Sequence, residues 1–416
     1  MSFIELEQYR GRRLVYLESI RGIAALAVVF HHVVLAFAPA VHEMQQTSPI
    51  LIRILLASPV SLLINGDFAV RIFFVLSGFV LSLSYFRKKQ TRVLTAAVSR
   101  RYPRLMLPAL GSVIFGWVLL KLGWYWNHEA AVLMGNPQTH HWLFRWFRLD
   151  RSFADAVREG AYGTFFHFDF RRTLNSNLWT MPIEWAGSLI VFSLLALCGW
   201  VQRRFFVYAI VVITFYAIEW PFLVDFVAGL ALCDVFTRCE RSDWETWLSP
   251  VWPTAALVGG LILGGMLGEW PNTHAGFSYY FVSCWPVMPA ILIVGGVAFS
   301  SKLHHTLESR AMAFLGKISF PLYLFHLFVI FSLGCWLYVC LRGWAMSHAS
   351  SALISAVVCI AISVLLAWAL YFILELPSLR FARRVGQWFM HSKSAESPVK
   401  RRPTTIAYTG TTNEVQ

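Results

Sequence analysis

Long apolar segments recur along this chain, and each is close to the length that crosses a lipid bilayer. We place ten of them within its 416 residues, at 17–38, 68–86, 105–122, 179–198, 204–217, 221–236, 252–268, 280–299, 319–340 and 352–374. About 20 apolar residues span the ~30 Å hydrocarbon core as a helix, in which every backbone polar group is satisfied internally. Only 14% of the residues are charged, against about 25% in soluble domains. The sequence therefore predicts an all-α, polytopic transmembrane helical bundle of about ten spans, of which the fifth and sixth could form one broken segment.

Basic residues gather on one side of the expected bundle. Residues 87–104 contain seven Lys or Arg and no acid, and the region from Arg380 to Arg402 is also basic. The loop at 268–280, on the opposite side, contains no Lys or Arg. The positive-inside rule then puts both termini in the cytoplasm, as ten spans require. We therefore expect a multi-pass protein of the cell membrane with the lipid bilayer as its partner. Its net charge of +13 reflects this orientation and not nucleic-acid binding.

Composition divides the chain into three parts. Residues 1–16 form a cytoplasmic N-terminus, residues 17–380 form the membrane-embedded domain, and residues 381–416 form a cytoplasmic tail that we expect to be disordered. The expected outer loop at 123–178 mixes six arginines and five acids with many aromatic residues. This loop either lies at the membrane interface as part of an aromatic belt or forms a re-entrant or lid-like element that helps to hold a ligand on the outer side.

Two ionisable residues, Arg21 and His32, lie within the first apolar segment. They are eleven residues apart, which places them within roughly 20° of one another on a helix and about 16 Å apart along its axis. The neighbouring His31 points roughly 80° away. Ionisable residues in a membrane-length helix are costly and mark functional sites by default. The alternative is a snorkelling arginine together with two histidines that pack between helices.

A carboxylate, Glu184, lies near the start of the fourth segment. Trp179 and Pro182 suit a helix start at the membrane interface, so Glu184 is within roughly 10 Å of the outer boundary. His32, about fifteen residues into the outward-running first segment, is also in the outer half. The two helices thus bring a base and a carboxylate to a similar depth, as a His–carboxylate pair requires. Equal depth does not by itself establish contact.

Five further polar residues lie at membrane depth. Asp67 and Arg71 are four residues apart at the start of the second segment and could pair on one helix face, with Ser77 near mid-helix. Tyr323 and His326 are three apart in the ninth segment and share a face. We expect these side chains to support the site. A structural Tyr–His bond between helices is the alternative for the last two.

Six blocks of sequence occur in an order that resembles the acyltransferase family 3 membrane proteins. They are Arg21 with His32, FFVLSGF at 73–79, RRYPRLMLP at 100–108, LWTMPIEW at 178–185, FLGKISFPLYLFH at 314–326 and LELP at 374–377. The resemblance covers about residues 14–380, and the chain departs from the family pattern at Glu18-Ser19, Thr180 and Phe320. It implies an integral-membrane O-acyltransferase that modifies cell-surface carbohydrates, lipopolysaccharide, peptidoglycan, exopolysaccharide or secreted small molecules.

The resemblance implies a cytoplasmic acyl-coenzyme A as the donor, with acetyl-coenzyme A as the first expectation. The anionic phosphates of this donor suit the inner cluster of Arg100, Arg101 and Arg104, because guanidinium forks match phosphate oxygens. Positive-inside topology alone would also explain these arginines. We expect no metal site and no bound cofactor, so acyl-coenzyme A enters as a substrate.

The acceptor hydroxyl of a glycan or small molecule would enter from the outer side. His32 would act as a general base or carry the acyl group itself, and Glu184 would orient it. Arg21 would hold the donor or stabilise developing negative charge. The sequence leaves direct transfer and an acyl-enzyme equally open. A proton-coupled transporter, in which the intramembrane His, Glu and Arg form a relay, is the alternative function. It predicts flux without dependence on acyl-coenzyme A.

Overall fold

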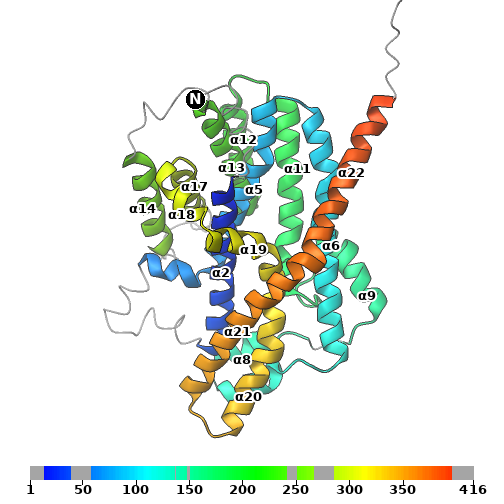
Figure 1. The fold of residues 1–416 in the computed structure, drawn as a ribbon, viewed down its shortest axis with the longest axis vertical. Coiled ribbons are helices and arrows are strands. Elements are labelled where there is room, and N and C mark those ends of the chain that lie inside the picture. Colours follow the sequence, from blue (N-terminus) through cyan, green and yellow to red (C-terminus); the bar gives the residue numbers. More distant parts are fainter. Residues whose placement is uncertain are drawn as a thin grey trace, which may run out of the picture.

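The fold is helical throughout the part of the chain that the structure, a computed structural model, describes. These residues are 14–38, 58–135, 137–147, 150–240, 251–266 and 285–395. No β-strand occurs within these ranges (Figure 1). The all-α class that the sequence predicts is therefore confirmed.

Six helical runs within the described ranges are long and apolar enough to cross a membrane. They are α2 (Val15–Phe37), α5 (Gly66–Lys88), α6 (Arg92–Lys121), η3 (Ser176–Trp179) with α11 (Thr180–Cys198), α19 (Arg310–Val329) with η6 (Ile330–Gly334) and α20 (Cys335–Gly343), and α21 (His348–Leu370) with η7 (Tyr371–Glu375) and the first part of α22 (Leu376–Ala395). A seventh is α17 (Val287–Ala298) with α18 (Ser301–Leu307), if this pair, bent by 89°, counts as one span. The chain is thus a polytopic helical membrane protein.

The predicted number of ten spans is not confirmed. Helices α12 (Arg204–Ala217) and α14 (Val251–Gly265) fall on two predicted segments, but they have only 14 and 15 residues. Their lengths of about 21–23 Å are short of a straight crossing. Helix α13 (Pro221–Cys239) has 19 residues but carries Asp225, Asp234 and Arg238. The end of the predicted seventh segment and the start of the eighth lie outside the described residues.

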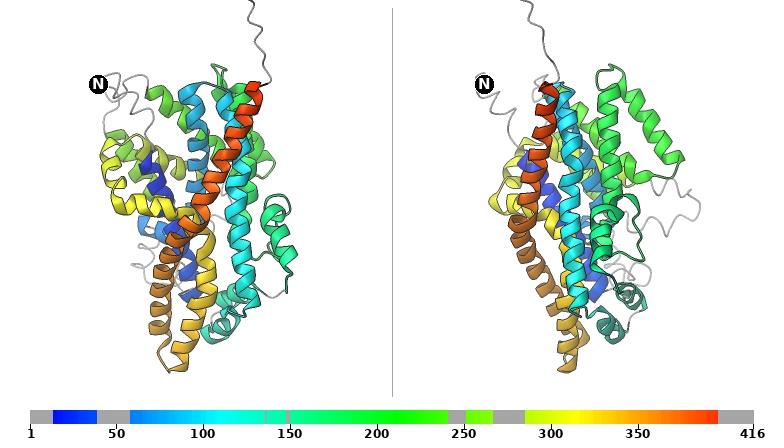
Figure 2. Two further views of the ribbon diagram at one scale, coloured as in Figure 1. Left: turned by 45° about the vertical axis from the view of Figure 1, so that its right-hand side comes forward. Right: turned by 90° about the vertical axis from the view of Figure 1, so that its right-hand side faces the viewer.

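The last helical run extends well beyond the predicted membrane domain (Figure 2). Pro377 has no N–H to bond the Ile373 carbonyl one turn earlier. The π-helical turn η7 accommodates this break, with the N–H of Leu376 bonded to the Tyr371 carbonyl. Helix α22 then packs along α6. Residues 381–395 are therefore helical where we expected disorder, because α22 has a partner to pack against, whereas residues 396–416 lie outside the described part.

Two helix crossings depend on the absence of a side chain. A Cβ on Gly22 of α2 would lie 2.5 Å from the carbonyl carbon of Leu315 in α19, and Gly316 of α19 faces the backbone of α2 in return. Where α5 crosses α13, a Cβ on Gly78 would lie 2.1 Å from the Phe226 carbonyl oxygen, and a Cβ on Gly229 would lie 2.0 Å from the Val75 carbonyl oxygen. Small residues allow this close approach in membrane proteins. These crossings fix the rotation of α2, α5 and α19, which carry much of the candidate site.

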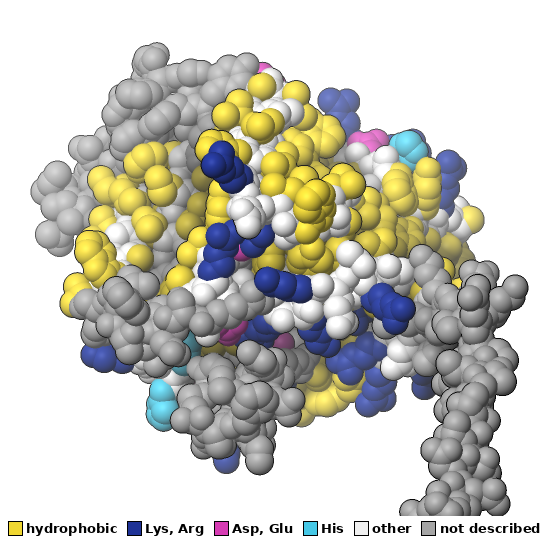
Figure 3. Space-filling model, turned by 90° about the horizontal axis from the view of Figure 1, so that it is seen from above, with side chains coloured by type: hydrophobic (Ala, Val, Ile, Leu, Met, Phe, Trp, Pro, Cys, Tyr) yellow, Lys and Arg dark blue, Asp and Glu magenta, His cyan; other side chains and the backbone are white. Residues whose placement is uncertain are grey.

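The connection at 123–178 folds into short elements, which are α7 (Asn127–Met134), α8 (Pro137–Phe144), α9 (Phe153–Arg158), η2 (Glu159–Gly163) and α10 (Thr164–Phe166). Of these, α7 and α8 lie at one end of the bundle, whereas α9, η2 and α10 pack along the side of α6 (Figure 1). Helix α8 and the turn between α20 and α21 lie at the lower end in Figure 1, whereas the start of α6 and the end of α22 lie at the upper end. Lys and Arg side chains are prominent on that upper end (Figure 3). The basic segments thus lie at the end opposite α7 and α8, and which end faces the cytoplasm stays a prediction.

Candidate active site

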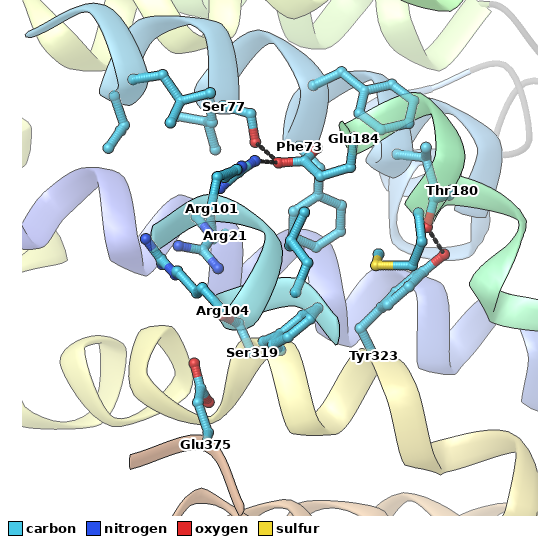
Figure 4. Close-up of a pocket in the computed structure, with 18 residues that line it drawn as sticks. Arg21, Phe73, Ser77, Arg101, Arg104, Thr180, Glu184, Ser319, Tyr323 and Glu375 are labelled. Carbon is cyan, nitrogen blue, oxygen red and sulfur yellow. Dashed lines mark hydrogen bonds and ion pairs between the residues drawn. The ribbon is translucent and has the colours of Figure 1, made fainter. Parts of the chain in front are cut away.

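Two cavities lie inside the bundle and share a neck. The inner chamber is lined from α2, α5, α6, α11, α19 and η7, and the mouth from α2, α5, α6, α19, η7 and α22 (Figure 4). The residues that line both define the neck: Arg21, Val80, Leu81, Arg101, Arg104 and Glu375. Counted with their open sides, the mouth holds about 1270 Å³ of empty space and the inner chamber about 860 Å³. The two cavities therefore adjoin at the neck, an arrangement that suits an elongated ligand with its bulkier end in the mouth.

The mouth is strongly basic. Its lining contains six basic side chains, from Arg21, Arg100, Arg101, Arg104, Lys317 and Arg383, and two acidic ones, from Glu18 and Glu375. Four separate helices contribute the cations, and a concave site with one sign of charge concentrates counter-ions. The mouth therefore suits a ligand whose bulkier end carries several negative charges.

A buried ion pair forms the wall beside the neck. Arg101 of α6 pairs with Glu184 of α11, and their side chains are only 7% and 12% exposed. The hydroxyl of Ser77 donates to the same Glu184 oxygen at 2.7 Å. Nε of Arg101 also donates to the hydroxyl of Ser188, one turn after Glu184, at 2.7 Å. The Glu184 carboxylate is thus engaged by α5 and α6 together.

Arg71 pairs with an acid other than the expected one. Asp67 is exposed in the first turn of α5, whereas Nη1 of Arg71 lies 3.1 Å from Oδ2 of the fully buried Asp225 in α13. The guanidinium carbon of Arg71 is also 4.2 Å from the ring centroid of Phe222. The prediction of an Asp67–Arg71 pair is therefore wrong, because α13 supplies a buried carboxylate and an aromatic face. Arg71 holds α5 against α13 and lines neither cavity.

Tyr323 and Thr180 close the end of the inner chamber that lies away from the neck (Figure 4). The Tyr323 hydroxyl donates to the Asn177 carbonyl at 2.8 Å and lies 3.0 Å from the Thr180 hydroxyl. The Asn177 side chain in turn donates to the Tyr323 carbonyl at 2.8 Å, and Asn175 donates to the Leu324 carbonyl at 2.9 Å. The segment that leads into α11, with Asn175 and Asn177, therefore fixes the position of α19 at the chamber.

His32 and His326 form a pair one helical turn beyond Tyr323. Nδ1 of His32 lies 2.9 Å from Nε2 of His326 and 3.1 Å from the Val28 carbonyl oxygen. Nδ1 of His326 lies 2.9 Å from the Leu322 carbonyl oxygen. A carbonyl only accepts, so Nδ1 of His326 carries the proton, and in the neutral ring its Nε2 accepts from Nδ1–H of His32. Nε2 of His32 is then unprotonated, as a general base requires.

The two adjacent histidines of α2 face different neighbours. Nδ1 of His31 lies 2.9 Å from the Ile64 carbonyl oxygen, and its ring packs against Gly66 at the start of α5. The ring of His32 stacks on Trp142 of α8, with the centroids 5.8 Å apart. His32 therefore lies between α19 and α8.

Comparison with known proteins identifies the family. A family model described as an acyltransferase domain matches residues 14–372, most of the chain. The chain belongs to acyltransferase family 3. It is similar to the O-acetyltransferase PaAT-1 of Phomopsis amygdali, with 26% identity over 359 residues that cover 75% of this chain and 71% of that protein. No solved structure matches. The protein is therefore an acyltransferase that transfers groups other than amino-acyl groups.

The structure separates the expected catalytic residues of this acyltransferase. Glu184 contacts Arg101 and Ser77, whereas His32 contacts His326, so the expected Glu184–His32 pair is not among the contacts of the described residues. Arg21 lines the neck, and His32 lines neither cavity. Tyr323 links the two regions, since it lines the chamber and its ring centroid is 6.5 Å from that of His326.

The three arginines expected to bind the donor also differ in their surroundings. Arg100 is exposed and lines the mouth, and Arg104 lines the neck. Neither has a hydrogen-bond or ion-pair partner within the described ranges. Two of the three nitrogens of Arg101 are instead engaged by Glu184 and Ser188. Arg100 and Arg104 are thus available to a ligand, while Arg101 is committed to its counter-ion.

Sequence patterns assign no role to two acids that line the neck or pair in the core, although one of them, Glu375, belongs to the LELP block at 374–377. Glu375 lines the neck, but it lies one residue beyond the predicted last span at 352–374, so its position at membrane depth is not apparent. Asp225 lies inside the predicted segment 221–236. An acid within an apolar segment is a signal that could have identified it.

Proposed function

We propose that this acyltransferase is an O-acetyltransferase of the cell membrane. It would move an acetyl group from acetyl-coenzyme A to a hydroxyl of a cell-surface glycan or small-molecule acceptor. The observation that carries the proposal is the pair of adjoining cavities, a basic mouth and an inner chamber that share the lining residues of the neck. The similarity to an O-acetyltransferase supports both the acetyl group and the oxygen acceptor.

The donor enters from the cytoplasm, with its nucleotide in the mouth. Its phosphates lie among Arg100, Lys317 and Arg383, since cationic side chains form charge-assisted hydrogen bonds with phosphate oxygens. The narrow arm that links the phosphates to sulfur passes the neck, and the thioester reaches the inner chamber near Tyr323. In this orientation the basic end of the bundle faces the cytoplasm, and the folded loop at 123–178 faces outward.

The acceptor approaches His32 from the side of the outer loop. Nε2 of His32 takes the hydroxyl proton as the acceptor oxygen bonds to the thioester carbonyl carbon. The carbon–sulfur bond then breaks, and coenzyme A leaves with the proton on its sulfur. His326 accepts a hydrogen bond from Nδ1–H of His32 and so stabilises the imidazolium that forms. The same nitrogen can instead carry the acetyl group before the acceptor arrives. Exchange of label between acetyl-coenzyme A and coenzyme A without acceptor distinguishes the two routes.

Binding of coenzyme A to the protein in lipid nanodiscs tests the donor site. Arg100→Gln should weaken binding about three- to tenfold, less than at a buried contact because Arg100 is exposed. Arg92→Gln is the matched control, since Arg92 is also exposed near the start of α6 but does not line the mouth. Equal binding by the wild type and both variants would contradict a donor site in the mouth.

Two measurements test the acceptor and the orientation. Mass spectrometry of surface glycans and extracts from cells with and without the gene should show the loss of an acetyl increment. A cysteine placed at residue 95 should be labelled only after the cells are permeabilised, and one in the 123–178 loop should be labelled from outside. External labelling at residue 95 would contradict a cytoplasmic donor site.

A further inference from the structure

A buried carboxylate without a partner lies in the neck. Glu375 is 9% exposed, and its Oε2 accepts no hydrogen bond from the described residues. Arg21 and Arg104 line the same neck, yet within the described ranges neither of them is within ion-pair distance of Glu375. A buried carboxylate that lacks a hydrogen-bond donor is costly. A ligand bound in the neck can therefore supply the hydrogen-bond donor that Oε2 of Glu375 lacks.

Local structure holds Glu375 in this position. Glu375 ends the π-helical turn η7, which precedes Pro377, and π-turns of this kind occur often at functional sites. The hydroxyl of Ser378 donates to the Leu374 carbonyl at 2.6 Å and so satisfies one acceptor of the irregular turn. Leu374 packs closely over Gly111 of α6. The turn is thus held against α6, and Glu375 faces the cavity.

The charges around Glu375 indicate what kind of group it can bind. In Figure 4 its carboxylate points toward Arg104 and Arg21, which approach from the other side of the neck. A phosphate is attracted by the two arginines but repelled by the carboxylate. An uncharged group with an N–H donor is favoured beside the carboxylate, and its carbonyl oxygen is favoured beside an arginine. A secondary amide has both groups.

We propose that Glu375 accepts a hydrogen bond from an amide N–H of the pantetheine arm of the donor and keeps the phosphates on the mouth side of the neck. The inference rests on the proposed use of acetyl-coenzyme A. The arm is the part of that donor that lies between the phosphates in the mouth and the thioester in the chamber. It contains two secondary amides and no charge, so it supplies the donor that the neck lacks.

Two ligands that differ by the arm test this inference. Coenzyme A carries the nucleotide and the arm, whereas adenosine 3′,5′-bisphosphate carries a phosphorylated nucleotide without the arm. Binding of both is measured by calorimetry for the protein in nanodiscs. Glu375→Met removes the acceptor at similar size and should weaken coenzyme A about 10- to 100-fold, as for a hydrogen bond to a charged group. Adenosine 3′,5′-bisphosphate should bind equally well or more tightly. Glu375→Gln retains a neutral acceptor and should be intermediate.

Arg100→Gln is the matched control, because it should weaken both ligands by the same factor. Equal loss of both ligands by Glu375→Met would overturn the role of Glu375, because damage to the fold weakens both ligands alike. Unchanged binding of both ligands would overturn it too, because the arm would then need no acceptor at this position. If wild-type protein binds coenzyme A and the variants show no arm-specific loss, this inference fails while the proposed function stands. If wild-type protein binds neither ligand, the proposed function fails and the inference fails with it.

Discussion

Glu184→Gln provides a quantitative test of the buried pair between α6 and α11. The substitution preserves size but leaves the Arg101 side chain, 7% exposed, without its counter-ion. Removing one partner of a buried ion pair costs about 3–5 kcal/mol. We expect about 3 kcal/mol, at the lower end of this range, because the Gln oxygen can still accept from Ser77 and Arg101. The variant should therefore unfold at clearly lower temperature or denaturant concentration.

Unfolding in one detergent with fixed lipid content is the assay, with Glu240→Gln as a control. Glu240 pairs with Arg87, but the two side chains are 24% and 16% exposed, so that change should cost about 1 kcal/mol or less. The double variant Arg101→Gln/Glu184→Gln should lose less stability than the sum of the single losses, because no uncompensated charge remains. A Glu184→Gln protein of normal stability and low turnover would refute this account and favour a direct role beside the base.

The remaining predictions concern the histidines, a helix crossing and the outer loop. His32→Ala should abolish turnover and His31→Ala should leave most of it, because His32 is the one of the two that contacts His326 of α19 among the described residues. Equal losses in folded, inserted variants would contradict this. Gly229→Ala should destabilise the protein by about 1–3 kcal/mol through overpacking, whereas Gly259→Ala, with nothing within 4 Å of its Cβ, should not. Burial raises the pKa of Glu159 in the connection at 123–178. Because the folded loop thus favours the protonated acid, this contribution to stability is present below about pH 4.3 and is lost as the pH rises through the raised pKa. Hydrogen exchange of the loop, corrected for intrinsic rates, should show this trend, and Glu159→Gln should abolish it.

Sequence predicts the helical class and most helix positions, because these depend on local apolar length and composition. It does not determine the number of spans. Helix α13 illustrates why, since its Asp225 lowers the hydropathy of the segment and yet is paired with Arg71 in the core. Helices α17 and α18 show a second cause, because an 89° bend interrupts an apolar run. Bends within helices and ion pairs between helices arise from packing. The mean hydropathy of one segment carries no information about that packing.

The same limit applies to the site. The rise per residue of a helix places His32 and Glu184 at similar depths in the membrane. Each helix taken alone does not predict which side chains of different helices come into contact. The partner of each side chain depends on the rotation and separation of neighbouring helices, which glycine crossings such as Gly22 with Gly316 set. Those crossings bring α19, with His326, onto α2, while α6 brings Arg101 to Glu184. The choice of counter-ion is thus a property of the assembled bundle.

The separation of charge and base within the bundle has a chemical consequence. The cations that suit the donor line the mouth and neck, whereas the unprotonated nitrogen belongs to a neutral histidine pair beyond Tyr323. A neutral pair keeps positive charge away from the position where the base must accept a proton, while distant cations hold the anionic donor. If Glu184 contacted His32 instead, the Arg101 charge would lose its counter-ion beside the neck. Pairing Glu184 with Arg101 and His32 with His326 therefore satisfies both needs within one set of helices.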